Sequence, residues 1–317
     1  MIPSPSRSLT LAQFSTPNTF AALHEAIHNY EDHRSRIGPI FTRTVRRYTP
    51  IMSAVDSNSK LAKSVGIDAD WAILSLSLAP ADSSGIEVCP MRSQACTEGC
   101  LGHNAGHGCM GIGAANNRHA LTPVRIARIK RTQELFGSNF GARNQPAALA
   151  ALAAIDYEIG KFTVWCAKKN LKPAVRLNAF SDITWEAIWP ELFVRHAGVQ
   201  FYDYTKIPVR LSWVKKPVNY HLTLSRSENN AGAVDNAISA GHNVAVVFGV
   251  KDPQLLPKTW HGVTVIDGTA HDKRFLDPKG VIVGLSWKGP AGKAAYFASL
   301  DAAISRGFAV SLTSSTL

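Results

Sequence analysis

Four of the chain's five cysteines lie in one short stretch, from Cys89 to Cys109, and this stretch holds the residues best suited to chemistry. Cys89, Cys96 and Cys100 fall within a window of twelve residues. The segment is polar, contains Gly99 and has no apolar period, so it is expected to form a loop. Thiolates this close together commonly form a disulfide, a zinc site or an iron–sulfur cluster.

The cysteine spacing favours an iron–sulfur cluster. The C-x2-C pairs typical of zinc ribbons are missing, whereas C-x6-C-x3-C supplies three thiolates from a loop that can wrap a compact cluster. Three thiolates on a [4Fe–4S] cluster leave one iron open to a small-molecule ligand. Two alternatives stay open at this point. Cys109 can complete the cluster as a fourth ligand, or His103, His107 and Cys109 can join a zinc site.

Composition bounds the protein class. Of the 317 residues, 45% are hydrophobic and 18% charged, as in globular proteins, and no apolar run is long enough to cross a membrane. The N-terminus lacks a secretion signal, so we expect a reducing cytoplasm, where lasting disulfides are rare. That expectation favours metal for the cysteine loop. Cys166, in an apolar helical pattern, is expected to be a buried thiol.

The net charge of +11 permits a nucleic-acid partner. The basic residues are scattered, however, with one denser run from Arg118 to Arg131. Within that run Arg125 and Arg128 share a helical face, and a solvated basic face is favoured over a nucleic-acid groove.

Short apolar segments alternate with helical patterns along most of the chain. Strands are expected at 71–78, 174–178, 200–204, 220–224, 244–248, 263–267, 281–285 and 308–312, and helices at 117–136, 147–169, 185–196, 231–240 and 291–306. This alternation predicts a parallel sheet, and the strand count predicts an α/β fold of the (β/α)8 TIM-barrel type, complete or partial. An open doubly wound sheet is the alternative. The Gly-rich dinucleotide fingerprint is absent.

Two parts of the chain are distinguished. Residues 1–69 are expected to form an N-terminal extension packed on the main body, and residues 70–317 the barrel-like domain that carries the cluster loop 89–109. In barrels the site lies at the carboxyl ends of the strands. The cysteine loop follows the first expected strand directly, so it is expected at this edge.

Polar side chains that follow later strands are candidates for ligand binding at the same edge. They are Asn178, Asp182, Glu186, Tyr204, Lys206, Ser225 and Arg226. The first three can face the cluster or its ligand, the next two can bind an anion or tune the cluster, and the last two can hold a carboxylate or phosphate at a helix N-terminus.

Each of these candidates also has a structural interpretation. Asp182 or Thr184 is expected to cap the helix that follows, because S-D-x-T-x-E resembles an N-terminal cap. Asp203, Tyr204 and Lys206 can instead form a salt bridge at a strand edge, and Ser225 can cap a helix.

Five sequence blocks in a fixed order resemble a family of uncharacterised phage-encoded iron–sulfur proteins. The blocks are CPMRSQACTEGCLGHNAGHG, ARIKRTQELF, RLNAFSDITWE, FYDYTK and LTLSRSE, and the resemblance covers about residues 70 to 290. It implies a barrel-type fold in which Cys89, Cys96 and Cys100 hold a four-iron cluster. It also implies the cytoplasm of a phage host as the location.

The same resemblance extends distantly to the radical S-adenosylmethionine enzymes, which place a three-cysteine cluster after the first strand of a barrel. This chain departs from their C-x3-C-x2-C spacing and has no Gly-Gly-Glu run. The expected function is therefore redox or cluster-mediated chemistry on a small ligand at the open iron. The alternatives are a radical S-adenosylmethionine enzyme, and a zinc- or cluster-stabilised module without enzymatic activity that binds nucleic acid or a host protein.

Overall fold

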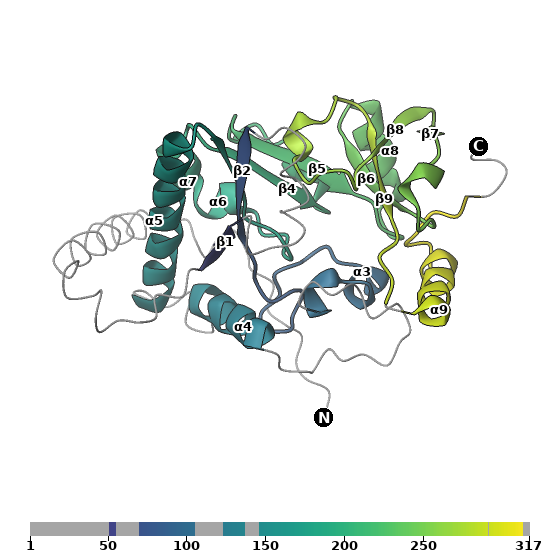
Figure 1. Ribbon diagram of the computed structural model, residues 1–317, viewed down its shortest axis with the longest axis horizontal. Helices are drawn as coiled ribbons and strands as arrows, with labels where there is room; N and C mark the ends of the chain where they lie inside the picture. The colour runs from purple at the N-terminus through teal and green to yellow at the C-terminus, as the bar shows by residue number, and fades with distance from the viewer. Residues whose placement is uncertain (1–50, 55–69, 105–122, 137–145, 291, 313–317) are drawn as a thin grey trace.

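The computed structural model describes residues 51–54, 70–104, 123–136, 146–290 and 292–312. Within these ranges one nine-stranded sheet has the order β1-β2-β3-β4-β5-β6-β9-β8-β7 (Figure 1). The strands are β1 (Met52–Ala54), β2 (Trp71–Leu76), β3 (Lys172–Arg176), β4 (Gln200–Thr205), β5 (Tyr220–Ser225), β6 (Val244–Phe248), β7 (Thr259–Trp260), β8 (Val263–Asp267) and β9 (Ile282–Ser286). All neighbours from β2 to β8 pair in parallel, while β1 and β7 are antiparallel edge strands.

The prediction of a (β/α)8 barrel is wrong, because the sheet is open. Antiparallel β1 occupies the outer edge of β2, and antiparallel β7 occupies the outer edge of β8. The two edges that a barrel would join are therefore covered by these short strands. The connection from β6 to β9 also contains strands β7 and β8 where a barrel would have a helix. The expected strand at 308–312 is reduced to a single bridge between Phe248 and Val310.

The helices match the apolar patterns closely, except for the short one at 94–98, which lies in the cysteine segment that was expected to form a loop. They are α3 (Gln94–Glu98), α4 (Pro123–Phe136), α5 (Pro146–Lys168), α6 (Trp185–Ile188), α7 (Pro190–Arg195), α8 (Ala231–Ser239) and α9 (Lys293–Ser305), with short 3-10 turns η4 (Leu101–Asn104), η6 (Pro208–Arg210), η7 (Pro253–Leu255) and η8 (Arg274–Leu276). The single helix expected at 185–196 is two helices, since Pro190 begins a new one and its ring cannot continue the first.

The two faces of the sheet differ in character. On the first face, Leu74, Val175 and Phe201 belong to the main apolar core, which also takes in residues of α5, α6, α7 and α8. Side chains alternate along each strand, so the residues between them lie on the opposite face. There Ile73, Ala174 and Tyr202 form a small cluster. We call this opposite side the second face.

The segment around η8 packs on the second face. The ring of Phe275 lies 5.2 Å from that of Tyr202 and 4.8 Å from that of Trp71. Asp272, from the same segment, accepts a hydrogen bond from Arg176 of β3. A polar, mostly buried layer therefore separates this side of the sheet from solvent.

Of the predicted N-terminal extension 1–69, the described part is residues 51–54. Its strand β1 joins the sheet, and the backbone N–H groups of Ile51 and Met52 donate to the Glu158 carboxylate of α5. Cys109 and His107 lie outside the described residues. Among the described helices, none combines the length and apolar character that crossing a bilayer requires.

Candidate functional site

The cysteine loop lies at the carboxyl edge of the parallel strands, as predicted. It follows β2, and the N–H of Asp182, after β3, donates to the carbonyl of Val88 at 2.7 Å. Helix α3 of the loop packs beside α9, because Ala95 shares a small apolar core with Tyr296 and Leu300 (Figure 1). The carboxyl edge thus carries the loop between the first strands and the last helix.

Cys89, Cys96 and Cys100 lie near one another. Burial raises the pKa of the Cys89 thiol well above its usual value, and the neighbouring thiols of Cys100 and Cys96 and the Asp182 carboxylate raise it further. The Cys89 thiol donates to the carbonyl of Phe180 at 3.6 Å. Among the described cysteines no disulfide is formed. Three thiols within electrostatic range at one edge of a sheet are suited to share a metal centre.

The described residues contain no group of three or more His, Cys, Asp or Glu side chains close enough to hold a single metal ion. The zinc alternative drew on His107 and Cys109, which lie outside the described ranges, so it stays a prediction.

Glu228, after β5, fastens the cysteine loop to the sheet. Its carboxylate accepts hydrogen bonds from the Ser93 hydroxyl at 2.8 Å and from the N–H of Ala95 at 3.0 Å. Ser93 in turn caps α3 by accepting from the N–H of Cys96. An anion at a helix N-terminus satisfies its unpaired N–H groups, so Glu228 fixes the turn that carries Cys96.

Arg128 of α4 contacts the cysteine loop just after Cys100. It donates to the carbonyl of Gly102 at 2.8 Å, and its guanidinium lies 4.3 Å from the ring centre of Phe180. Gly102 has no room for a side chain, since a Cβ there would lie 2.9 Å from the Phe180 ring. The expected solvated face is wrong for Arg125 and Arg128, which are 5% and 8% exposed.

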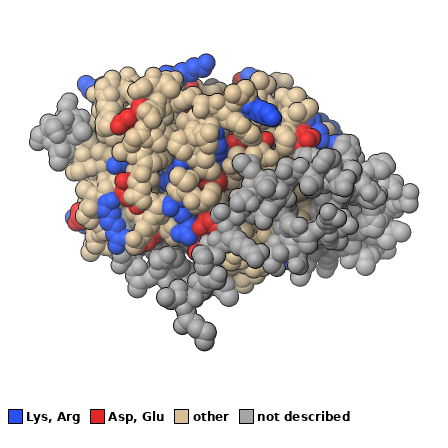
Figure 2. Space-filling view, turned by 180° about the vertical axis from the view of Figure 1, so that it is seen from behind, with Lys and Arg blue, Asp and Glu red and all other residues tan. Residues whose placement is uncertain are grey.

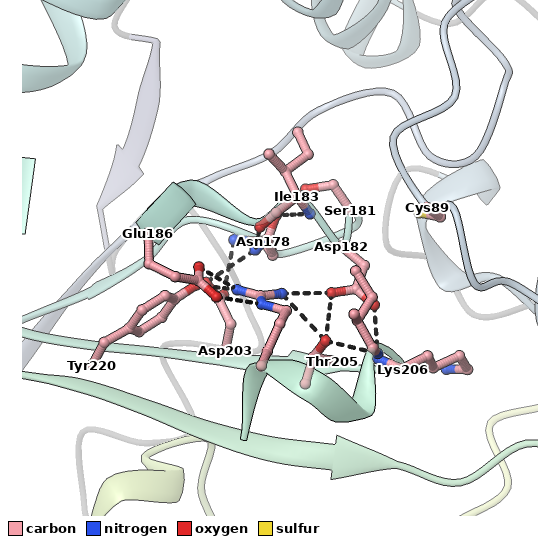
Figure 3. Close-up of polar contacts among 12 residues, drawn as sticks. Cys89, Asn178, Ser181, Asp182, Ile183, Glu186, Asp203, Thr205, Lys206 and Tyr220 are labelled. Carbon is pink, nitrogen blue, oxygen red and sulfur yellow. Dashed lines mark hydrogen bonds and ion pairs between the residues drawn. The ribbon is translucent and has the colours of Figure 1, made fainter. Parts of the chain in front are cut away.

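Lys206, directly after β4, brings a positive charge to the thiols. Burial alone would lower the pKa of Lys206, but the Cys96 thiol, the Asp182 carboxylate and the Cys89 thiol together raise it. Its ammonium donates to the Ser225 hydroxyl at 3.1 Å. Figure 3 shows Asp182 and Lys206 on the side of the polar network that is nearer Cys89. Asp182 and Lys206, both predicted from the sequence, thus lie beside the cysteine trio, which is Cys89, Cys96 and Cys100.

A buried ion network lies behind Asp182 (Figure 3). Arg210, which is 1% exposed, donates to both carboxylate oxygens of Glu186 at 2.7 and 2.9 Å and to Asp182 at 2.7 Å. It also donates to the hydroxyl of Tyr220 at 2.9 Å. This arrangement explains why Glu186 can be 1% exposed, because its charge is paired and both oxygens are bonded.

The predicted cap by Asp182 or Thr184 is wrong. Thr184 occupies the N-cap position of α6 but makes no side-chain capping bond. The Asp182 carboxylate instead accepts from the Thr205 hydroxyl at 2.8 Å and the Lys206 N–H at 2.7 Å, in addition to Arg210. A buried guanidinium attracts the carboxylate more strongly than a helix end does.

Asn178 and Asp203 extend the network to the loop after β3. Asp203 accepts from the N–H of Asn178 at 2.8 Å and from the hydroxyl of Tyr220 at 2.7 Å. The Asn178 side-chain oxygen accepts from the Ser181 hydroxyl and the N–H of Ile183, which shapes the loop after β3. Asn178 therefore positions the loop that contacts Cys89.

Tyr204 and Arg226 have separate surroundings. The Arg176 guanidinium lies 5.0 Å from the ring centre of Tyr204, on the second face. Arg226 donates to the carbonyls of Gly307 and Phe308, which tie the end of β5 to the chain after α9. The structure thus brings Lys206, Ser225 and Asp182 toward the cysteines and directs Arg226 elsewhere.

Sequence reasoning missed Arg210, Glu228 and Arg176 as parts of the site. Arg210 and Arg176 have long-range partners, 24 or more residues away, which no local pattern reveals. Glu228 had one usable signal. It follows a parallel strand at the edge where the cysteine loop was already expected.

Replacing Asp203 by Asn is expected to flatten the pH dependence of stability between about pH 4 and 7. Burial raises the pKa of Asp203 to about 7, although Arg176, Tyr220 and Asn178 act in the opposite direction. Because the folded pKa exceeds the unfolded one, the protonated carboxyl stabilises the fold. That contribution is full below the unfolded pKa and is lost as the pH rises toward 7.

The free energy of unfolding from urea titrations between pH 4 and 8 measures this effect. The wild type should lose on the order of 2–4 kcal/mol more than Asp203→Asn across that interval. Exposed Asp70, replaced by Asn, is the control and should follow the wild type. Equal pH slopes for wild type and Asp203→Asn would show that the carboxyl is ionised throughout.

A family model described as Gene product 88 matches residues 51–310. The matched span contains every strand of the described sheet, the cysteine loop and Lys206. It confirms the coarser part of the resemblance, a phage-type gene-product family, and carries no statement on iron, sulfide or S-adenosylmethionine. No curated protein and no solved structure matches the chain.

Proposed function

The chain belongs to the gene product 88 family, and we propose that it binds a [4Fe–4S] cluster through Cys89, Cys96 and Cys100. The open iron of that cluster is proposed to bind a small molecule for redox or cluster-mediated chemistry. One observation carries the proposal. Three thiols lie within electrostatic range of one another at the carboxyl edge of a parallel sheet.

The C-x6-C-x3-C spacing in the sequence favours a cluster. In a cluster each thiolate binds a different iron, so the ligands surround an object several atoms wide. A zinc ion needs its ligands at one point, and two residues of the zinc alternative, His107 and Cys109, lie outside the described residues. The residues around the three thiols also carry the positive charge that bound thiolates need. Lys206 interacts with the Cys96 thiol, and Arg128 with the Cys100 thiol, so cations offset the negative charge of three thiolates.

When bound, the cluster supplies electron transfer and a Lewis-acidic iron. The chain's own residues supply the rest. Glu228 and Ser93 fix the turn that carries Cys96, and Arg128 fixes the loop after Cys100. Lys206, held by Ser225, presents an ammonium group beside the thiols, where it can bind the acidic part of a ligand.

A radical S-adenosylmethionine enzyme is the second candidate. The observation that favours it is the position of the cysteine loop, directly after the first parallel strand of a sheet in which β2 to β6 follow chain order. A nucleic-acid-binding module is less well supported. On the face in Figure 2, Lys and Arg lie scattered among Asp and Glu, and the described residues there form no basic stripe.

Electron paramagnetic resonance of the reduced, oxygen-free protein tests the open iron. Added cyanide should change the cluster signal, because it can bind an iron that no cysteine occupies. An unchanged signal would mean a fully ligated cluster and would refute chemistry at an open site. Formation of 5′-deoxyadenosine after addition of S-adenosylmethionine would establish the radical alternative instead.

A further inference from the structure

The amino edge of the parallel strands, opposite the cysteine loop, carries a row of lysines. Five described segments lead into strands at this edge: 168–172 into β3, 196–199 into β4, 213–219 into β5, 239–243 into β6 and 277–281 into β9. Parallel strands begin at the same edge of a sheet, so the side chains of these segments gather along one rim. We call this rim the amino-edge surface. Its lysines are Lys168, Lys169, Lys172, Lys215, Lys216 and Lys279.

Hydrogen bonds join neighbouring segments of the amino-edge surface. The side chain of Asn219 donates to the carbonyl of His196 at 3.2 Å, which ties the segment before β5 to the one before β4. The side chain of Asn243 donates to the carbonyl of Pro278 at 2.8 Å, which ties the segment before β6 to the one before β9. The surface is therefore built from segments that are fixed to one another.

The segments before β5 and β6 are also close to each other. Burial lowers the pKa of His242, and the nearby charge of Lys216 lowers it further. From β3 to β9 the sheet order contains four strand spacings, each of about 4.8 Å, so the row of lysines spans roughly 19 Å. This length suits an extended, charged ligand better than a single small anion.

Acidic residues offset little of this positive charge. Within the five segments the acid is Asp277, whose side chain is 1% exposed and pairs with Arg274 at 3.3 Å. Exposed Asp70, before β2, pairs with Lys172 at 3.6 Å. Other lysines of the surface remain exposed without an acid in their own segment's exposed part, and the rim attracts polyanions. The exposed ones are Lys168, Lys169, Lys215 and Lys279.

Trp165 adds an aromatic surface beside these lysines. It is 47% exposed, and Phe162 covers one side of its indole, with the ring centres 6.0 Å apart and the planes at 15°. Lys161 precedes Trp165 by four residues and Lys168 follows it by three, so all three share one face of α5. An exposed aromatic ring flanked by cations can stack on a nucleic-acid base while the cations contact phosphates.

We propose that the amino-edge surface binds single-stranded nucleic acid, with the phosphates along the lysines and a base stacked on Trp165. The charge favours a polyanion, and the exposed indole favours one with unpaired bases over a duplex or an acidic protein. The lysines form a row along a rim, which the mixed charges on the face in Figure 2 do not exclude. The surface lies at the opposite edge from the cysteines, so the inference does not depend on the cluster.

Fluorescence anisotropy of a labelled single strand of about 16 nucleotides tests the proposal on the full-length chain. The chain should bind the single strand more tightly than a duplex of the same sequence, because only the single strand offers unpaired bases. The affinity should fall as the salt concentration rises. Iron content is measured separately, so failure of the cluster proposal leaves this result unaffected.

Paired lysine variants locate the binding surface. Lys168→Gln combined with Lys169→Gln should reduce the slope of log affinity against log salt by about 1.4, since each phosphate contact on a single strand contributes about 0.7. Lys130→Gln combined with Lys293→Gln removes the same charge from exposed positions in α4 and α9, and it should leave the slope unchanged.

Trp165→Leu tests base stacking. It should weaken binding of the single strand at least about fivefold and leave binding of the duplex nearly unchanged. Phe297→Leu, at a ring that is 46% exposed in α9, is the control and should bind like the wild type. The thermal midpoint of each variant shows whether it is folded.

Three results would overturn the proposal. The first is no binding of the single strand at low salt. The second is the same salt slope in the two paired lysine variants, which would place any binding elsewhere on the chain. The third is equal affinity for single strand and duplex together with no effect of Trp165→Leu, which would leave only a nonspecific attraction of charges.

Discussion

Arg210→Met is expected to lower the free energy of unfolding by about 3–5 kcal/mol, the largest effect on stability that the structure predicts. The substitution removes the guanidinium that pairs with two carboxylates, Glu186 and Asp182, and a donor to the Tyr220 hydroxyl. Glu186 is 1% exposed, so its charge would lie unpaired in the interior. Equilibrium unfolding in urea at pH 7 gives the free energy directly.

Two further variants show whether the loss of stability comes from the buried ion pairs of Arg210. Lys172→Met breaks an ion pair whose side chains are 60% and 68% exposed, and it should cost no more than about 0.5 kcal/mol. Combining Arg210→Met with Glu186→Gln removes one uncompensated charge and should recover part of the loss. If Arg210→Met cost as little as Lys172→Met, the network would be solvated and would not hold the loop after β3.

Alanine at any one of Cys89, Cys96 or Cys100 is expected to remove most of the iron from anaerobically prepared protein, the largest effect expected on metal content. Three thiolates leave no spare ligand, so the loss of one exposes two irons of the cluster. Iron and acid-labile sulfide per chain, measured after desalting, give the outcome. The protein should remain folded, because α3 is fastened by Glu228 and by the ion pair between Arg306 and Glu98.

Two other cysteines are the controls for this series. Cys166 is fully buried in α5, where burial raises the pKa of its thiol to about 11, so Cys166→Ala should keep the iron. Cys109→Ala should also keep it if the fourth iron is open. Equal iron loss in Cys166→Ala would attribute the effect to general damage, and loss in Cys109→Ala would make Cys109 the fourth ligand.

The strands could be predicted because each is a short apolar run bounded by polar residues. Segments such as 244–248 are apolar on both sides, which is the mark of a parallel strand buried on both faces. Whether the sheet closes into a barrel could not be predicted. Periodicity gives the number of strands, whereas β1, three residues long, has no pattern of its own and still decides that the edge of β2 is covered.

The cysteine trio and its place at the carboxyl edge followed from local spacing and from the direction of parallel strands. The partners of the candidate residues did not. Asp182 looked like a helix cap because the cap pattern is local, while Arg210 acts from 28 residues away. Arg125 and Arg128 looked solvated because a basic face usually is, yet the cysteine loop and Phe180 cover Arg128.

The most direct test of the central claim is the iron, sulfide and zinc content of the wild-type chain purified and reconstituted without oxygen. The account predicts a brown protein with about four irons and four sulfides per chain and no stoichiometric zinc. A colourless protein without iron, or one with a single zinc ion, would contradict it.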